Sequence, residues 1–284
     1  MKLRTVCAAA AFACVGGWVQ AGPVVTGSVD ALTLANTIGG VGITISNPTL
    51  TYAGAATLPL PSGTFTGGGT TVGFSEGIVL TNGTIGCVPG PNNASGCGLE
   101  RSFVADNSGV FDRTTLAFDF SSDTGKVFFR YVFGSEEYTQ FVDSEFNDAF
   151  QLLLNGVNIA QLPGGGGEVS INNVNCGSNS AYYRNNVDTD NGDEDNNTCA
   201  TLGLDIQYDG LTTILTASAD VIAGASNRFE FTIFDRGDSA LDSAVFIEKG
   251  SFSGEDPNPM PEPGSLLLAA VALAGAGALR RRST

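Results

Sequence analysis

Two blocks of acidic residues lie beside apolar segments and contain the side chains best suited to bind a cation. The first follows the apolar segment 127–133, and the second precedes the segment 243–252. Calcium takes about six to eight oxygen ligands, often carboxylates from neighbouring loops. If the blocks meet at one end of a folded sheet, they predict a structural Ca²⁺ site. Its candidate ligands are Glu136, Glu137, Asp143, Asp148, Asp235, Asp238 and Asp242.

The alternative interpretation is that these acids stabilise turns by accepting hydrogen bonds from nearby backbone amides. A second and weaker cation candidate is the loop in which Asn186, Asp188 and Asp190 have the spacing that opens an EF-type loop. The closing position of that loop is Asn197 instead of a bidentate Glu, so the match is incomplete. A solvated acidic loop is therefore the preferred interpretation of this stretch.

Catalysis is disfavoured by the complete absence of His. Without His the chain lacks the usual general base for a Ser or Cys nucleophile and the commonest zinc ligand. A glycosidase needs only two carboxylates, about 5.5 Å or about 6.5–9.5 Å apart. Glu136 and Glu137 are unsuitable, because adjacent side chains on a strand point to opposite faces. Glu137 with Asp242 remains a possible pair, but we expect a non-catalytic protein.

Charge and cysteine content restrict the partners and the compartment. The 284-residue chain has a formal net charge of −16, and phosphate binding requires clustered Lys and Arg, so we expect no nucleic-acid partner. Four Cys lie outside the N-terminal segment, and an even number in an exported chain indicates disulfides. Their shortest rings are Cys87–Cys97 and Cys176–Cys199, although other pairings are open. The lack of CxxC spacing argues against zinc.

The elements that must position these residues are strands. Period-two alternation of apolar residues predicts strands at 41–45, 116–120, 127–133 and 229–233. Asn155-Gly156 predicts a hairpin turn between 150–154 and 157–159. Further strands are expected within 212–219 and 243–252, and Asp30 predicts the start of a short helix over 31–36. We predict an all-β fold, an antiparallel β-sandwich or jelly roll in one domain over 22–254.

Both ends of the chain have the composition of sorting segments. Residues 1–21 combine Lys2 and Arg4 with an apolar stretch and a small-x-small site ending at Ala21, which predicts a cleaved signal helix. Residues 255–263 form a Pro-rich linker, and 264–284 form a hydrophobic helical tail that ends in basic residues. A permanent membrane anchor is the alternative interpretation of this tail.

The tail resembles the PEP-CTERM sorting signal of Gram-negative bacteria that make exopolysaccharide. The resemblance is carried by the motif Pro261, Glu262 and Pro263, the apolar segment after it, and the cluster Arg280, Arg281 and Arg282. Met260 stands where many members carry Val. The resemblance implies recognition by an exosortase, a membrane cysteine transpeptidase, after transient anchoring in the inner membrane. It also implies removal of the hydrophobic tail.

The body of the chain resembles the choice-of-anchor L domain from about residue 28 to 252. The segments 131–138, 141–148 and 235–247 carry this resemblance, and the acidic insert around Asp188 departs from it. The resemblance implies a β-sandwich surface protein without an established enzyme activity. We therefore expect an exported cell-surface or matrix protein with a structural or adhesive role linked to exopolysaccharide.

A carbohydrate-binding module that depends on Ca²⁺ is the alternative function. In that interpretation Tyr138, Tyr182 and Tyr183 are exposed and stack on sugar rings. Trp18, the single Trp, lies in the predicted leader, so the mature domain has no Trp to serve as a stacking surface.

Overall fold

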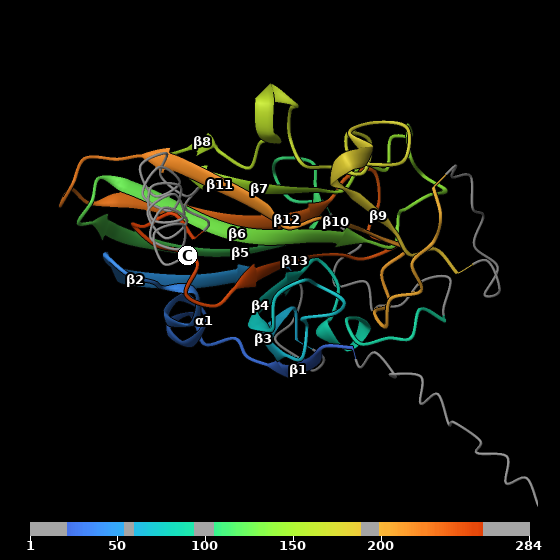
Figure 1. Ribbon diagram of the computed structural model, residues 1–284, viewed down its shortest axis with the longest axis horizontal. Coiled ribbons are helices and arrows are strands. Elements are labelled where there is room, and N and C mark those ends of the chain that lie inside the picture. The colour runs from blue at the N-terminus through green and yellow to red at the C-terminus, as the bar shows by residue number, and fades with distance from the viewer. Residues whose placement is uncertain (1–21, 54–59, 94–104, 189–198, 258–284) are drawn as a thin grey trace, which may run out of the picture.

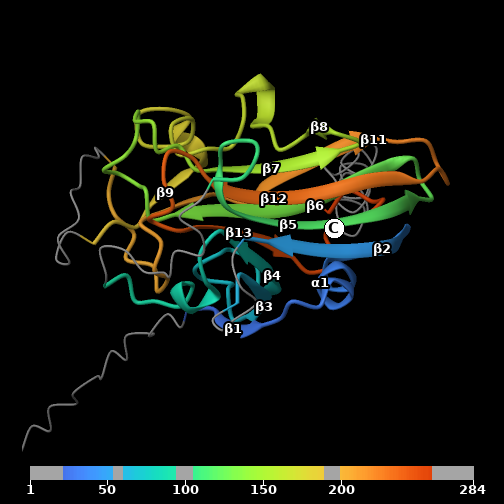
Figure 2. The same ribbon diagram turned by 180° about the vertical axis from the view of Figure 1, so that it is seen from behind.

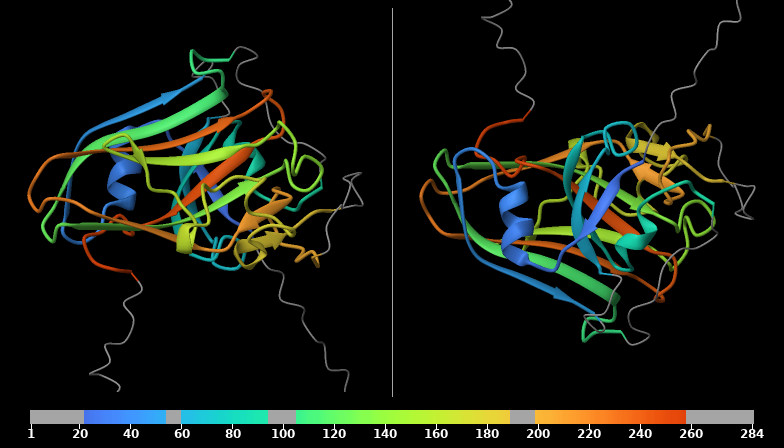
Figure 3. Two further views of the ribbon diagram at one scale, coloured as in Figure 1. Left: turned by 90° about the horizontal axis from the view of Figure 1, so that it is seen from above. Right: turned by 90° about the horizontal axis from the view of Figure 1, so that it is seen from below.

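The computed structural model describes residues 22–53, 60–93, 105–188 and 199–257, which form two antiparallel sheets packed face to face (Figure 1, Figure 3). The larger sheet has the order β1-β3-β4-β13-β6-β10-β9, with β11 also paired to β6. Its strands are β1 (Val24–Gly27), β3 (Ser62–Thr66), β4 (Glu76–Thr81), β6 (Lys126–Ser135), β9 (Tyr183–Asn185), β10 (Gly210–Thr212), β11 (Leu215–Asp220) and β13 (Ser243–Glu248).

The smaller sheet has the order β2-β5-β12-β7-β8, and Figure 2 shows β2, β5, β12 and β7 side by side. Its strands are β2 (Ile43–Tyr52), β5 (Phe111–Ser122), β7 (Ala149–Leu154), β8 (Val157–Asn158) and β12 (Asn227–Asp235). Three short 3₁₀ helices lie in the connections: Ile85–Cys87, Pro163–Gly165 and Ser180–Tyr182. The prediction of an all-β sandwich is confirmed.

The predicted strands 116–120, 127–133 and 229–233 lie within β5, β6 and β12, whereas the predicted strand 41–45 begins only at Ile43, after a turn at 41–42. The hairpin between β7 and β8 is also confirmed: Asn155 and Gly156 have φ of 50° and 84°, as a type I′ turn requires. The segments 212–219 and 243–252 were predicted too long. In the first, β10 and β11 are separate strands, and in the second β13 ends at Glu248.

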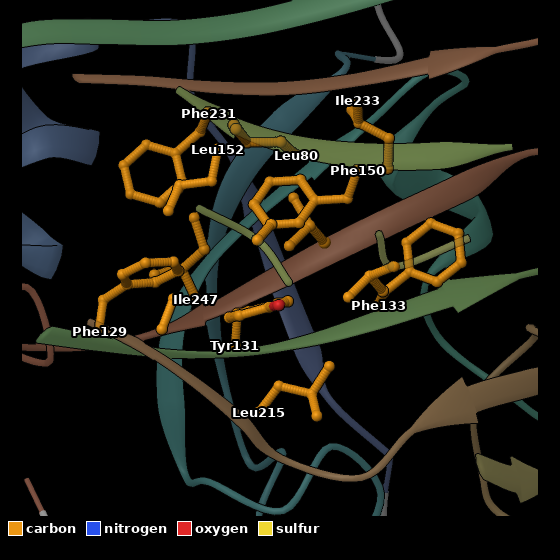
Figure 4. Packing of buried hydrophobic residues seen from close by; sticks show 14 of the residues in the cluster. Leu80, Phe129, Tyr131, Phe133, Phe150, Leu152, Leu215, Phe231, Ile233 and Ile247 are labelled. Carbon is orange, nitrogen blue, oxygen red and sulfur yellow. The ribbon is translucent and has the colours of Figure 1, made fainter. Parts of the chain in front are cut away.

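The main core lies between the sheets and is rich in aromatic side chains. Figure 4 shows Phe150 of β7 and Phe231 of β12 against Phe129 and Tyr131 of β6 and Ile247 of β13. The rings of Phe129 and Phe231 meet edge to face with centroids 5.5 Å apart. Such pairs contribute beyond the area that they bury. The two sheets are therefore held by interdigitated rings contributed by strands far apart in the sequence.

A second core covers the outer face of the larger sheet. Val79, Val132 and Phe246 point to this face and are buried by Val88 and Tyr208, which lie in the connections 82–92 and 199–209. The central strands β4, β13 and β6 are therefore buried on both faces. This burial explains the unbroken apolar runs 78–80 in β4 and 244–247 in β13. Because the runs do not alternate, the sequence alone does not show which side chains face the main core.

One helix, α1 (Ala31–Ile38), closes the side of the sandwich near β2 (Figure 1). The side chain of Asp30 accepts a hydrogen bond from the backbone N–H of Leu32 at 3.2 Å, which confirms the predicted N-cap. Leu34, Ala35 and Ile38 are buried against the core. The helix extends two residues beyond the predicted segment because Ile38 has an apolar site to fill.

The disulfide Cys176–Cys199 is present, as predicted, and links positions 23 residues apart. Cys87 is also disulfide-bonded, while its predicted partner Cys97 lies outside the described residues. The predicted signal segment 1–21, the PEP motif and the tail 264–284 lie outside them too. Over the part that the structure describes, no helix has the length and apolar character needed to cross a membrane.

Phe252 provides a test of the aromatic core. Its ring is fully buried and lies 4.6 Å from the ring of Phe229 and 5.1 Å from that of Phe118, measured between centroids. We expect Phe252→Ala to lower the free energy of unfolding by about 3–5 kcal/mol, since it leaves a cavity between the sheets.

Urea denaturation measures this loss. Ile222→Ala serves as the control, because Ile222 is 78% exposed and its truncation is expected to change stability by less than about 0.5 kcal/mol. Equal effects of the two substitutions would contradict the assigned role of Phe252.

Candidate functional site

Strands from both sheets meet at one end of the sandwich and bring acidic residues together there. In the larger sheet β4 and β6 end at this point and β13 begins, with Ser243 opposite Ser135. In the smaller sheet β12 ends there, while β5 and β7 begin, with Phe234 opposite Ala149. The carboxyl groups that flank these strand ends form what we call the carboxyl cluster: Asp112, Glu136, Glu137, Asp148, Asp235 and Asp242.

The carboxyl cluster is withdrawn from solvent. Every member is at most 4% exposed, and Asp148 is fully buried. A buried charge is unfavourable unless a partner, a proton or a metal ion neutralises it. The alternative interpretation, in which these acids accept hydrogen bonds from backbone amides, holds for part of the cluster: Glu136 accepts from the N–H of Asp242 and Asp148 from that of Arg236.

Asn82 joins the two sheets at the centre of this region. Its amide Nδ2 donates to Oδ2 of Asp148 at 3.3 Å and also to Oδ1 of Asp235. Its Oδ1 accepts from the backbone N–H of Ser243 at 2.6 Å and from that of Gly83 at 3.1 Å, which fixes the orientation of the amide. The Ser243 hydroxyl adds a further bond to Asp148 Oδ2 at 2.8 Å. The carboxylates of the smaller sheet are thus tied to the ends of β4 and β13.

Asp242 and Glu136 form the part of the cluster nearest the larger sheet. The backbone N–H of Asp242 donates to Glu136 Oε2 at 3.2 Å, and the N–H of Glu136 donates to the Asp242 carbonyl at 3.0 Å. The Asp242 carboxylate lies directly on Gly83, where an added Cβ would be 1.6 Å from Oδ2. Position 83 therefore accepts no side chain while Asp242 keeps this place.

Mutual repulsion and burial favour the protonated forms of three members. Burial, followed by the charges of Asp148, Asp238 and Glu136, raises the pKa of Glu137 to about 10. Burial raises the pKa of Asp148 to about 6, although hydrogen bonds from its neighbours act in the opposite direction. Burial and the charge of Asp148 raise the pKa of Asp235 well above its ordinary value. As folded, the region needs protons or a cation.

The protein groups around Glu137, Asp148 and Asp235 do not fully compensate the negative charge of these carboxylates. Asp235 Oδ2 and Glu137 Oε2 have no hydrogen-bond partner among the described residues. In the same residues, neither Lys nor Arg forms an ion pair with Glu137, Asp148 or Asp235. Arg236 reaches Asp148 only through its backbone N–H, at 3.2 Å, while its guanidinium pairs with Glu168 at 3.1 Å.

The acids predicted from the sequence divide into two groups. Glu136, Glu137, Asp148, Asp235 and Asp242 come together in the carboxyl cluster. The remaining predicted residues are not buried members of the cluster: Asp238 is half-buried and its charge acts on Glu137, Asp143 is exposed on the loop after β6, Asp188 is half-buried, and Asp190 lies outside the described residues. Across the described ranges, no three or more Asp, Glu or Cys side chains are already arranged around a point that would hold a metal ion.

Asn82 and Asp112 were missed by the sequence analysis. Asn82 follows the apolar run 77–81 directly, so a polar residue at the end of a buried strand was the available signal. Asp112 gives no comparable signal, because its place depends on the pairing of β5 with β12.

The predicted exposure of Tyr138 and Tyr183 is wrong. Both side chains are buried, and their ring centroids lie 4.8 Å apart. Gly210 makes this possible, because an added Cβ there would meet Tyr138 at 2.5 Å and Tyr183 at 2.7 Å. Tyr182 is half-buried. The tyrosine platform expected for sugar stacking is therefore part of the protein interior.

The carboxyl cluster predicts an unusual pH dependence of stability in EDTA. Because Glu137 has an ordinary pKa of 4.5 and a pKa of about 10 when folded, the folded state holds its proton more tightly. The stability that this proton contributes is fully present below pH 4.5 and is lost as the pH rises towards about 10. We therefore expect Glu137→Gln to gain stability relative to the wild type as the pH increases.

Urea denaturation at about pH 5 and about pH 8 measures this difference, since both values lie inside the window. Glu145→Gln is the control, because Glu145 is exposed on the same loop. A difference between Glu137→Gln and wild type that stays the same at both pH values would contradict the prediction.

Comparison with known families accounts for both parts of the chain. The choice-of-anchor L domain model matches residues 24–253, and the PEP-CTERM protein-sorting motif matches residues 261–282. Neither the curated proteins nor the solved structures include a significant match. The sorting motif is a signal recognised by exosortase, and the two matches identify an exported cell-surface protein. Because the domain match covers most of its length, the chain belongs to the choice-of-anchor L domain family.

Proposed function

We propose that this protein is a non-catalytic structural or adhesive component of the cell surface or extracellular matrix of a Gram-negative bacterium, linked to exopolysaccharide. The observation that carries the proposal is the order of the matched segments: one β-sandwich domain over 24–253 is followed at once by a sorting motif over 261–282. In this order, the folded domain is the part that is sorted and the motif is the signal that directs its sorting.

The proposed route begins with export and transient anchoring in the inner membrane by the apolar segment 264–279. The cluster Arg280–Arg282 would stay on the cytoplasmic side, as basic residues beside membrane segments do. Exosortase would then act at Pro261–Pro263 and remove the hydrophobic tail. The folded domain would leave the membrane with only its Pro-rich linker.

A non-catalytic role is supported by the position of the acidic residues. A glycosidase pair must contact the substrate, whereas Glu137 and Asp242 are 2% and 3% exposed. The chain has no His to act as a general base, and Cys87, Cys176 and Cys199 are disulfide-bonded. These observations favour scaffold or adhesion over glycan hydrolysis. The lectin alternative loses its aromatic platform, since Tyr138 and Tyr183 are buried.

Replacing Pro261-Glu262-Pro263 by three Ala should block sorting. We expect the variant to accumulate at full length in the membrane fraction, because the apolar segment remains attached. Fractionation of cells with a C-terminal epitope tag after Thr284 measures whether the tail is retained.

Pro257→Ala with Pro259→Ala is the matched control, because it changes the same linker outside the motif. We expect this control to be processed like the wild type. Wild-type protein that keeps its tail in the membrane at steady state would contradict exosortase processing.

The link to exopolysaccharide predicts binding. We expect the purified protein to be retained on immobilised exopolysaccharide from its own host, and heat-unfolded protein to pass through. Retention is measured by the amount of protein in the wash and in the eluate. Failure to bind would leave adhesion to other proteins as the role, and release of reducing sugars would instead favour a hydrolase.

A further inference from the structure

The carboxyl cluster has a further property that a surface location does not explain. We propose that Glu137, Asp148 and Asp235 bind one Ca²⁺ ion, which joins the ends of the two sheets. Glu137 follows β6 of the larger sheet, whereas Asp148 precedes β7 and Asp235 ends β12 of the smaller sheet. This inference is independent of the sorting route, because it concerns only the folded domain.

The negative charge of the cluster is the first reason to expect a cation. The three carboxyls are at most 2% exposed, and neither Lys nor Arg of the described residues pairs with them. Three neutral donors compensate part of the charge of Asp148, namely the Asn82 amide, the Ser243 hydroxyl and the Arg236 backbone N–H, and the Asn82 amide also donates to Asp235. Neutral donors do not cancel several negative charges in a region of low dielectric constant. A divalent cation does.

Carboxyl oxygens without a hydrogen-bond donor are the second reason. Asp235 Oδ2 and Glu137 Oε2 are buried and have no hydrogen-bond partner among the described residues. A buried carboxylate oxygen without a donor is rare and requires an explanation. Asp148 is close enough to both groups for its charge to act on each of them, so the three carboxyls are neighbours.

The closeness of two of the oxygens is the third reason. Asp148 Oδ2 and Asp235 Oδ1 both accept from the Asn82 amide nitrogen, so these two oxygens lie together around one donor. An ion held about 2.3–2.6 Å from each oxygen requires ligands that are grouped in this way. The three side chains do not form a metal site as they stand, and the proposal requires the Glu137 side chain to turn towards Asp148 and Asp235 when Ca²⁺ binds.

The donor set selects the ion. All donors of the carboxyl cluster are oxygens, and the chain contains no His, so metals that prefer nitrogen or sulfur are disfavoured. Mg²⁺ requires nearly ideal octahedral geometry and keeps several of its waters, whereas Ca²⁺ accepts irregular sets of carboxylate ligands. The donor set of the carboxyl cluster therefore favours Ca²⁺.

The test uses the full chain, treated with EDTA and then titrated with CaCl₂ at constant pH. At a Ca²⁺ concentration about 100 times Kd, the folding equilibrium constant should rise about 100-fold, because only the folded state forms the site. Equilibrium dialysis should show one bound ion for each chain. Mg²⁺ at the same concentration should give a smaller shift, and an equal shift would contradict the assignment to Ca²⁺.

Asp235→Asn and Glu137→Gln should each reduce Ca²⁺ affinity at least about tenfold by removing a charged ligand. Asp123→Asn and Glu145→Gln are matched controls, since both residues are exposed and Asp123 lies at the opposite end of the sandwich, between β5 and β6. Both controls should bind Ca²⁺ like the wild type. Without Ca²⁺ the two cluster variants should be at least as stable as wild type, which separates lost binding from lost folding.

Three outcomes would overturn the proposal. In the first, wild type neither binds Ca²⁺ nor changes in stability. In the second, Asp235→Asn and Glu137→Gln bind as wild type does. In the third, Asp188→Asn abolishes binding, which would move the site to the acidic loop. If Asp235→Asn does not fold, Glu137→Gln decides alone, and wild-type affinity in that variant would overturn the proposal.

Discussion

Repulsion among buried carboxyl groups is the constraint on which the end of this sandwich depends. Asp148 and Asp235 belong to the smaller sheet, and the Asn82 amide that bonds both belongs to the larger. Because Asp148 directly precedes β7 and Asp235 ends β12, both carboxyls lie at the same edge of two paired strands of the smaller sheet. The aromatic core holds the sheets together along their length, but it cannot compensate charges at their ends.

The pattern of apolar and polar residues was sufficient to predict most strands of the two sheets, but it predicted only part of the carboxyl cluster. Period-two alternation identified β5, β6 and β12 because burial alternates along part of each of these strands. The acids after β6 and before β13 were predicted to meet because they flank strands. The place of Asn82 could not be predicted, since it depends on the order β4-β13-β6, which pairs segments far apart in the sequence. The burial of Tyr138 likewise depends on Gly210, a contact that no local pattern reveals.

The last residues of the domain explain how one fold can be joined to a sorting segment without altering its core. Phe252 fills the space between the sheets, and Ser253 forms an isolated bridge with Phe128. The N–H of Gly254 donates to the Val41 carbonyl at 2.8 Å. The packed structure is therefore completed before the sorting motif at 261–282 begins. Residues 255–260 separate that motif from the last residues of the core in the sequence.

A buried site for protons or a cation makes the stability of the domain depend on its surroundings. Calcium sites of extracellular modules have dissociation constants of about 10⁻⁴–10⁻³ M. With an affinity in that range, the proposed site would stay empty at the low Ca²⁺ concentrations that cytosolic sensors detect, about 10⁻⁷–10⁻⁵ M. Ca²⁺ would then join the ends of the sheets only after export, so the domain would reach its highest stability at the cell surface.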